Sequence, residues 1–169
     1  AEGGTLFLDE ISSASPAMQV KLLRVLQTRE FEPVGSNKTI TSNARVILAS
    51  NKDLAEEVKA GRFREDLYYR INVVTVNLPP LAERAGDIPL LAEKFLNNFC
   101  RMHSRNKTRI SPEAMEFLQR YDWPGNVRQL ENVIERAVLL SKGDEIVPDD
   151  FPPAITAQST GNYNVSSSA

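Results

Sequence analysis

Residues 3–10 read Gly-Gly-Thr-Leu-Phe-Leu-Asp-Glu, a short apolar strand that ends in two adjacent carboxylates. The apolar run predicts a strand buried on both faces of a parallel sheet. Asp9 and Glu10 follow at its carboxyl end, where open α/β sheets bind ligands. One carboxylate suits a Mg²⁺ ion beside substrate phosphates, and the other can polarise an attacking water. Acids at a strand end also commonly cap the next helix, so this stretch alone leaves both interpretations open.

Composition limits the classes of function. The 169 residues suffice for one medium domain or two small ones, and the net charge of -2 provides no basic surface for nucleic acid, so direct DNA binding is disfavoured. The sequence has no secretory signal and no apolar run of membrane length, which predicts a cytoplasmic protein without membrane contact. Cys100 and His103 lack partners at metal-ligand or triad spacing, so both are expected to be structural.

The first half of the chain alternates strand and helix patterns, which predicts a parallel α/β layer. A helix is expected over residues 16–29, with Ser15 as its N-cap and Pro16 at its first position. The residues expected on its packed face are Met18, Leu22, Val25 and Leu26. The other expected elements are a hairpin with strands 31–34 and 40–45, a buried strand over 44–49, a short helix over 53–59 and a strand over 72–76.

After residues 78–80 (Leu-Pro-Pro) the pattern predicts helices only, with a domain boundary near residues 79–86. The expected helices span residues 87–102, residues 111–121 with Ser111 as N-cap, and a third that ends near residues 142–143. Asn126 and Gln129 have the spacing of a capping box at the start of that third helix. The residues beyond Pro153 are small and polar, which predicts a disordered tail.

Four segments together carry a family resemblance. Residues 3–10 resemble a Walker B strand, residues 49–51 (Ala-Ser-Asn) a first sensor, residues 61–70 (Gly-Arg-Phe-Arg-Glu-Asp-Leu-Tyr-Tyr-Arg) an arginine-finger segment, and residues 123–132 (Trp-Pro-Gly-Asn-Val-Arg-Gln-Leu-Glu-Asn) a second sensor. In this order they resemble the central AAA+ ATPase domain of the sigma-54-dependent transcription activators, or bacterial enhancer-binding proteins. The resemblance implies an α/β fold in three parts: a partial AAA+ P-loop NTPase core over residues 1–80, an α-helical lid over 81–153 and a tail or linker over 154–169.

The resemblance implies a role for the residues at both strand ends. Asp9 would hold the Mg²⁺ shell of a bound ATP, and Glu10 would orient the hydrolytic water. Ser50 and Asn51 would sense the γ-phosphate through hydrogen bonds. The alternative for the last two is that they merely cap the helix that follows them.

Arg64 and Arg70 correspond in the resemblance to arginine fingers, which reach the nucleotide of the adjacent subunit. A guanidinium suits this role because it is always charged and donates two parallel hydrogen bonds to a phosphate. The alternatives are an exposed ion pair between Asp66 and Arg70 and an ordinary solvated position for Arg64. Arg62 is interpreted as a surface charge.

Arg128 lies at the start of the third lid helix, where the helix dipole disfavours a cation, and this suggests an anionic partner. The resemblance implies that Arg128 contacts the bound nucleotide. Pairing with Asp122 or Glu131 is the structural alternative. Trp123 and Pro124 are interpreted as core packing and a rigid corner.

Two departures from the family pattern limit these implications. Ala82 stands where the family usually has another arginine. Residues 1–169 also contain neither a G-x-x-x-x-G-K-[ST] phosphate loop nor the Gly-Ala-Phe-Thr-Gly-Ala loop that grips the sigma factor. We therefore expect the isolated chain to bind ATP weakly and to hydrolyse almost none.

Two hypotheses follow. In the first, the chain is part of an ATPase that uses ATP and Mg²⁺, assembles as a ring of six or seven subunits and remodels sigma-54 RNA polymerase holoenzyme through the absent loop. In the second, it is a non-catalytic lid and oligomerisation fragment whose incomplete sheet exposes unpaired edges, with marginal stability or association. A fragment of another AAA+ ATPase is disfavoured by residues 123–132.

Overall fold

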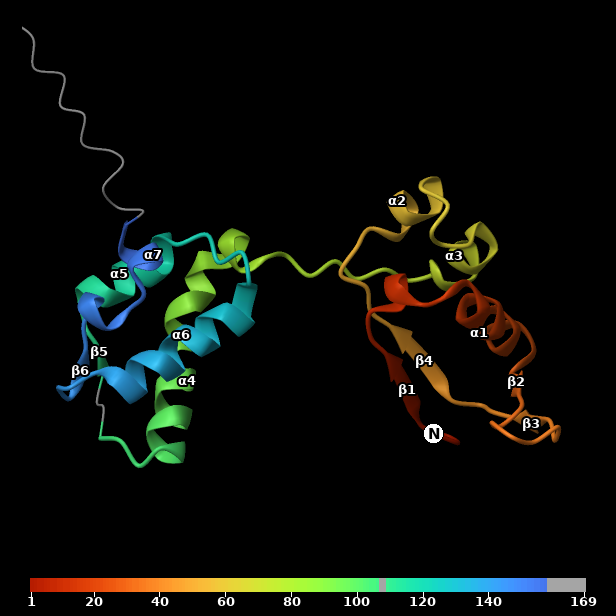
Figure 1. The fold of residues 1–169 in the computed structure, drawn as a ribbon, viewed down its shortest axis with the longest axis horizontal. Coiled ribbons are helices and arrows are strands. Elements are labelled where there is room, and N and C mark those ends of the chain that lie inside the picture. The colour runs from red at the N-terminus through yellow and green to blue at the C-terminus, as the bar shows by residue number, and fades with distance from the viewer. Residues whose placement is uncertain (107–108, 158–169) are drawn as a thin grey trace, which may run out of the picture. The chain divides into compact units, whose positions relative to one another are not determined.

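The computed structural model describes residues 1–106 and 109–157. They form two compact units that divide between Val76 and Asn77 (Figure 1). Each unit has its own cluster of buried apolar side chains. Within the described ranges, no helix combines the length and apolar character needed to cross a bilayer.

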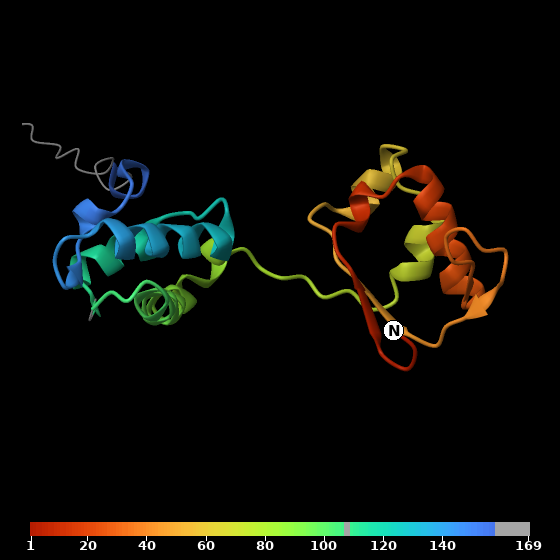
Figure 2. The ribbon, with the colours of Figure 1, turned by 60° about the horizontal axis from the view of Figure 1, so that its bottom comes forward.

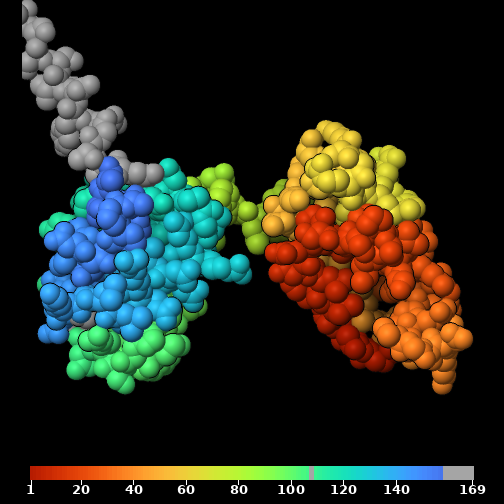
Figure 3. Space-filling view, in the orientation of Figure 1, coloured from red at the N-terminus to blue at the C-terminus, as the bar shows by residue number. Residues whose placement is uncertain are grey.

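The first unit is an α/β layer built on a parallel strand pair. Strand β1 (Thr5–Leu8) pairs in parallel with β4 (Arg45–Leu48), as the sequence predicts. The remaining elements are η1 (Ile11–Ser13), α1 (Pro16–Thr28), β2 (Glu30–Phe31), β3 (Ile40–Thr41), α2 (Leu54–Lys59) and α3 (Glu65–Ile71). Strands β2 and β3 form an antiparallel hairpin at the expected place, but with two residues each they are shorter than the predicted strands 31–34 and 40–45. The tip of the hairpin stands out from the surface of this unit (Figure 3).

Local signals explain where α1 begins and ends. Ser15 is its N-cap, and the Ser15 hydroxyl accepts the Met18 N–H at 3.3 Å. The helix ends at Arg29, which takes a left-handed conformation with φ 63°. Helix α1 packs beside α3 (Figure 2), and the buried cluster between the helices and the strand ends contains Ile11, Leu22, Phe63 and Leu67.

Two strand predictions need correction. Strand β1 is not buried on both faces, because Leu6 and Phe7 are 41% and 58% exposed. The described sheet has only two strands, and of β1 only Leu8 packs against the core cluster. Residues 72–76 do not form a strand, and Val73 and Val74 are more than three-quarters exposed, because no described strand lies beside them to pair with.

The second unit is the expected helical lid with one addition. Its elements are η2 (Leu81–Asp87), α4 (Ile88–Met102), β5 (Arg109–Ile110), α5 (Pro112–Arg120), α6 (Asn126–Leu140), β6 (Glu145–Ile146), η3 (Pro148–Asp150) and α7 (Pro153–Thr156). Ser111 caps α5 as predicted, accepting the Ala114 N–H at 3.1 Å. The short parallel pair β5–β6 was not expected, and it forms where Ile146 is fully buried in the lid core.

Two further expectations for this unit are wrong in part. Helix α7 occupies the start of the predicted disordered tail, because Ile155 is only 3% exposed and packs into the lid core. The rest of that tail, from residue 158, lies outside the described residues. The N-cap of α6 is Gly125 and not Asn126, whose side-chain oxygen instead accepts the Leu81 N–H at 2.8 Å.

Candidate functional site

The parallel register of β1 and β4 brings the two predicted polar segments together. Leu8 pairs with Leu48, so Asp9 and Glu10 leave one strand where Ser50 and Asn51 leave the other. Backbone bonds extend this pairing beyond the strands: the Ala49 N–H donates to Leu8, and the Ile11 N–H donates to Ala49, both at 2.9 Å. Acids and polar side chains therefore share one end of the sheet.

The two acids lie beside an open hollow and are not used as helix caps. The Glu10 backbone is left-handed, with φ 53° and ψ 41°, and its side chain makes no capping bond to η1. Asp9 Oδ1 accepts the Glu10 N–H at 2.8 Å. Both residues are exposed, and neither carboxylate forms an ion pair with any residue in the described ranges. The hollow, of about 360 Å³, is lined by Leu8, Asp9, Glu10, Ile11, Ser13, Ala14, Met18 and Leu22.

Ser50 and Asn51 do not cap the following helix. Asp53 caps α2 by accepting two backbone N–H groups. The Ser50 hydroxyl closes a tight turn with the Lys52 backbone, donating at 2.7 Å and accepting at 3.1 Å. Asn51 Oδ1 accepts from the buried Ser12 hydroxyl at 3.3 Å, which leaves the amide nitrogen of Asn51 without a partner among the described residues. The capping alternative is therefore wrong, and a side-chain N–H donor remains at the strand end.

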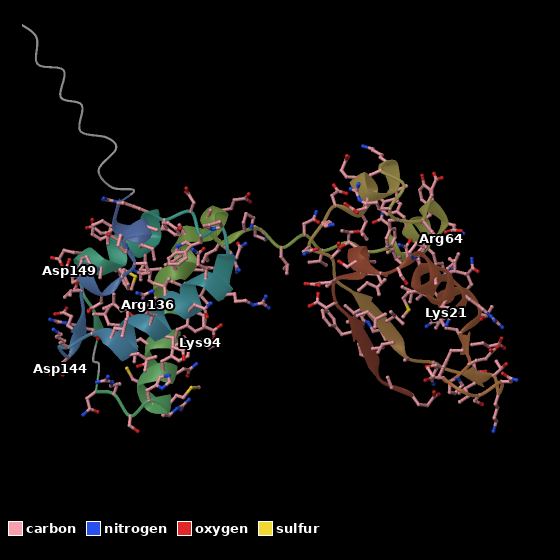
Figure 4. All side chains as sticks on the ribbon, in the orientation of Figure 1. Lys21, Arg64, Lys94, Arg136, Asp144 and Asp149 are labelled. Carbon is pink, nitrogen blue, oxygen red and sulfur yellow. The ribbon has the colours of Figure 1, made fainter. Side chains whose placement is uncertain are left out.

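Arg64 and Arg70 are both exposed, at opposite ends of α3 (Figure 4 labels Arg64). Arg64 forms a two-bond ion pair with Asp66, its Nε lying 2.9 Å from Oδ1. This pair lowers the pKa of the Asp66 carboxyl and raises the pKa of the Arg64 guanidinium. Arg70 Nη2 donates to the Leu26 carbonyl at 2.8 Å. The Asp66–Arg70 pair expected as an alternative is thus absent, since Asp66 binds Arg64.

Arg62 lies on the surface as predicted, but it also forms an ion pair that was not expected. Its guanidinium donates two bonds of 2.8 Å to Glu57, whose side chain is only 7% exposed. The bonds from Arg62 lower the pKa of the Glu57 carboxyl. Gly61, with φ +71°, makes the turn that brings the two residues together. Opposite charges on either side of a glycine turn were the only sequence signal for this pair.

Arg128 lies in the first turn of α6 in the second unit. Its side chain is exposed and has no ion-pair or hydrogen-bond partner among the described residues, so pairing with Asp122 or Glu131 is not observed. The helix start is held by Gln129, whose Oε1 accepts the Gly125 N–H at 2.8 Å. A Cβ at Gly125 would lie 2.8 Å from the Gln129 Cβ, which explains the glycine.

Trp123 and His103 of the lid are held by packing and hydrogen bonds within that unit. Trp123 is 1% exposed, and its Nε1 donates to the Leu118 carbonyl at 2.7 Å, as its predicted packing role requires. His103 Nε2 lies 3.1 Å from Glu135 Oε1, and its ring stacks on Phe99. Across residues 1–106 and 109–157, no group of three or more His, Cys, Asp or Glu is placed to hold a metal ion.

Comparison with known proteins matches both units. Residues 1–77 match the family model of the sigma-54 interaction domain, and residues 82–168 match that of the AAA+ ATPase lid domain. Transcriptional regulatory protein ZraR of Salmonella typhimurium is 55% identical over 157 residues, which are 93% of this chain and 36% of ZraR. Nitrogen fixation protein AnfA of Azotobacter vinelandii is 50% identical over 162 residues, 95% of this chain and 30% of AnfA. The chain thus spans about a third of the length of these curated relatives.

Solved structures show the same fold. Crystal structures of NtrX from Brucella abortus in complex with ADP and with ATP have TM-scores of 0.86 and 0.85 to this chain, at 40% and 39% sequence identity. The matches cover 92% and 94% of this chain and 36% and 38% of the NtrX chains.

Proposed function

Because the chain belongs to the AAA+ family of sigma-54-dependent transcription activators, we propose that it forms part of a ring ATPase that remodels sigma-54 RNA polymerase holoenzyme. The observation that carries this proposal is the shared strand end of Asp9, Glu10, Ser50 and Asn51. Hydrolysis of a nucleotide can use one acid to bind Mg²⁺, a second acid to orient water and an amide donor to bind phosphate, and this strand end offers all three.

The proposed cofactors are ATP and Mg²⁺. The likeness to NtrX crystallised with ADP and with ATP supports a nucleotide. Asp9 is exposed beside the hollow and has no ion-pair partner among the described residues, which fits a cation that takes one protein carboxylate and completes its shell with phosphate and water. Magnesium would neutralise phosphate charge as bonds to phosphorus form and break.

Within this site the other side chains have separate tasks. Glu10 would accept a hydrogen bond from the attacking water and hold its oxygen toward the γ-phosphorus. Ser50 and Asn51 would sense the γ-phosphate. The amide nitrogen of Asn51, which has no partner among the described residues, would donate to a γ-phosphate oxygen, and the Ser50 hydroxyl would exchange its bond to the Lys52 carbonyl for one to the phosphate. Arg128 lies near a helix N-terminus and has no partner in the described part of the chain, and we propose that it binds the nucleotide from the lid.

Arg64 and Arg70 are proposed to act on the nucleotide of the adjacent subunit. Both guanidinium groups lie on the surface of the first unit, as a group that acts across an interface must. Arg64 would exchange Asp66 for phosphate oxygens, and the exchange is easy because an exposed ion pair is weak. A ring of six or seven subunits would place such an arginine at every interface.

The work of the ring is proposed to be the remodelling of sigma-54 holoenzyme so that promoter DNA opens. Such a protein works in the cytoplasm beside RNA polymerase. The net charge of -2 supports action through the polymerase and not through direct DNA contact by this chain.

The test uses the complete gene product that contains residues 1–169. We expect ATP hydrolysis that Glu10→Gln abolishes, while Glu113→Gln, an exposed glutamate of α5 in the lid, leaves it within about twofold. Equal amounts of Glu10→Gln and Arg64→Ala subunits should hydrolyse more ATP together than either alone, because some interfaces then contain an intact acid and an intact arginine. Absence of hydrolysis in the wild type would reject the proposal in favour of a non-catalytic oligomerisation module.

A second measurement uses the 169-residue chain itself. Calorimetric titration with Mg-ATP should detect only weak binding, because residues 1–169 contain no phosphate loop. Tight binding would contradict the expectation that a phosphate loop supplies most of the binding free energy for ATP.

A further inference from the structure

Gln19 occupies a core position on α1 next to Met18, the residue that the sequence pattern places on the packed face. Its side chain is 1% exposed, whereas Met18, predicted to face the core, is 54% exposed. A buried amide is costly unless its polar atoms are bonded. The bonds of Gln19 therefore need an explanation.

The Gln19 amide joins α1 to the segment that carries the arginines. Its Nε2 donates to the Ala14 carbonyl at 2.9 Å and to the Arg62 carbonyl at 3.1 Å. Its Oε1 accepts the Arg64 N–H at 2.9 Å. One side chain thus binds a backbone acceptor and a backbone donor on either side of Phe63, as a peptide group of a neighbouring strand would.

The same short segment is held from its other side as well. The Arg62 and Phe63 N–H groups both donate to the Glu57 carbonyl, at 2.9 and 3.1 Å. Phe63 itself is 3% exposed in the core of the first unit. With Gln19 in place, every backbone N–H from residue 62 to residue 64 is bonded. The backbone from which Arg64 projects is therefore fixed by α1 on one side and by α2 on the other.

We propose that Gln19 is a positioning residue that fixes the backbone of Arg62 and Arg64 and thereby aims Arg64 at the nucleotide of the adjacent subunit. The inference rests on the proposed function, which makes Arg64 a residue that acts in trans. An apolar side chain of similar size would fill the same space in the core. The amide is needed for the bonds to the arginine segment, and the direction of Arg64 depends on those bonds.

The test compares two glutamines of the same helix in the complete gene product. Gln19→Leu keeps the buried volume but removes the three bonds. Gln27→Leu is the matched control, since the Gln27 side chain is exposed and makes no bond to a described residue. We expect Gln19→Leu to lower kcat for ATP hydrolysis about 10-fold with KM within about twofold, because a small misplacement of a catalytic group is costly. The control should stay within about twofold in both constants.

Subunit mixing separates positioning from a general loss of structure. Gln19→Leu subunits retain Asp9 and Glu10, and Glu10→Gln subunits retain a correctly aimed Arg64. Equal mixtures should therefore be more active than either variant alone. Gln19→Leu should also add little to the loss already caused by Arg64→Ala, because both changes remove the same contact.

Several results would overturn the inference. They are an unchanged kcat, a loss expressed mainly in KM, a loss that mixing does not restore, and an effect fully additive with Arg64→Ala. If Gln19→Leu does not fold, Gln19→Met removes the same three bonds with an unbranched apolar side chain of similar length, and it must then show a loss of kcat that mixing restores. Failure of the proposed function is recognised separately, because the wild type would then lack ATPase activity or Arg64→Ala would keep it.

Discussion

Replacing Glu10 with glycine should stabilise the first unit while abolishing ATP hydrolysis. Glu10 has φ 53° and ψ 41°, the left-handed conformation that residues with a Cβ atom avoid. Glycine adopts this conformation without the steric contact between Cβ and the carbonyl oxygen. The same change removes the carboxylate proposed to orient water, so stability and activity should move in opposite directions.

The size of the effect follows from the backbone. The left-handed conformation costs a residue with a Cβ atom roughly 1–2 kcal/mol. Part of this gain is offset, because glycine makes the unfolded chain more flexible and thereby lowers the free energy of unfolding by about 0.5–1 kcal/mol. The hydrogen bond from the residue 10 N–H to Asp9 can form whether residue 10 is glutamate, glutamine or glycine, so it does not change the comparison. We therefore expect Glu10→Gly to be more stable than Glu10→Gln, which keeps the strain, by about 0.5–1 kcal/mol.

Two probes can separate the units in the 169-residue chain. Hydrogen exchange of peptides from residues 5–28 reports the first unit, and these should exchange about 2- to 5-fold more slowly in Glu10→Gly than in Glu10→Gln. Trp123, the only tryptophan of the chain, reports the lid by fluorescence, and its urea transition should be the same in both variants. ATP hydrolysis, measured in the complete gene product, should be lost in both.

Equal exchange rates in the two variants would refute the assignment of strain to residue 10. Faster exchange in Glu10→Gly would show that the glutamate side chain stabilises this turn. Retained hydrolysis in either variant would refute the role proposed for the carboxylate.

Three further predictions address other parts of the chain. Arg62 lowers the pKa of Glu57, so this pair stabilises the first unit above about pH 4.3, and the stabilisation is lost as the pH falls through the lowered folded-state pKa of Glu57. The free energy of unfolding that Glu57→Gln loses relative to the wild type, measured in urea, should therefore be smaller at pH 3 than at pH 7. Ile134 is fully buried in the lid, so Ile134→Val should lower the free energy of unfolding by about 0.5–1.5 kcal/mol, read from Trp123 fluorescence in urea. Arg128 is exposed and has no partner among the described residues, so Arg128→Ala should leave lid stability unchanged while weakening Mg-ATP binding to the complete gene product about 10-fold, measured by calorimetry.

The features predicted correctly from the sequence depend on neighbouring residues. Ser15 and Ser111 are followed directly by proline, and both cap the helices that begin there. The hairpin around residues 35–37 forms where turn residues separate two short apolar segments. The parallel pairing of β1 with β4 follows from alternating strands and helices, and it accounts for the meeting of Asp9 with Ser50.

The features that were missed depend on partners distant in sequence. Residues 72–76 have a strand composition, but a strand needs a neighbour and the described chain supplies none. Gln19 binds residues more than forty positions away, and its periodicity alone indicates only a polar residue on an apolar helix face. The shift of the α6 cap from Asn126 to Gly125 depends on the Leu81 N–H, which takes the asparagine oxygen. The catalytic roles of the site residues stay predictions until hydrolysis is measured.

The register of β1 against β4 sets the spacing between the proposed water-orienting acid and the proposed phosphate sensor. Leu8 stands opposite Leu48, and each strand advances by about 3.3 Å per residue. A slip of a single residue would therefore move Glu10 by that length relative to Asn51 and turn β1 over, so that Leu8 left the core. An insertion or deletion between residues 5 and 8 should consequently displace Glu10, proposed to orient water, from Asn51, proposed to sense phosphate, even when every polar side chain is retained. The apolar residues that fix this register therefore also set the distance between Glu10 and Asn51.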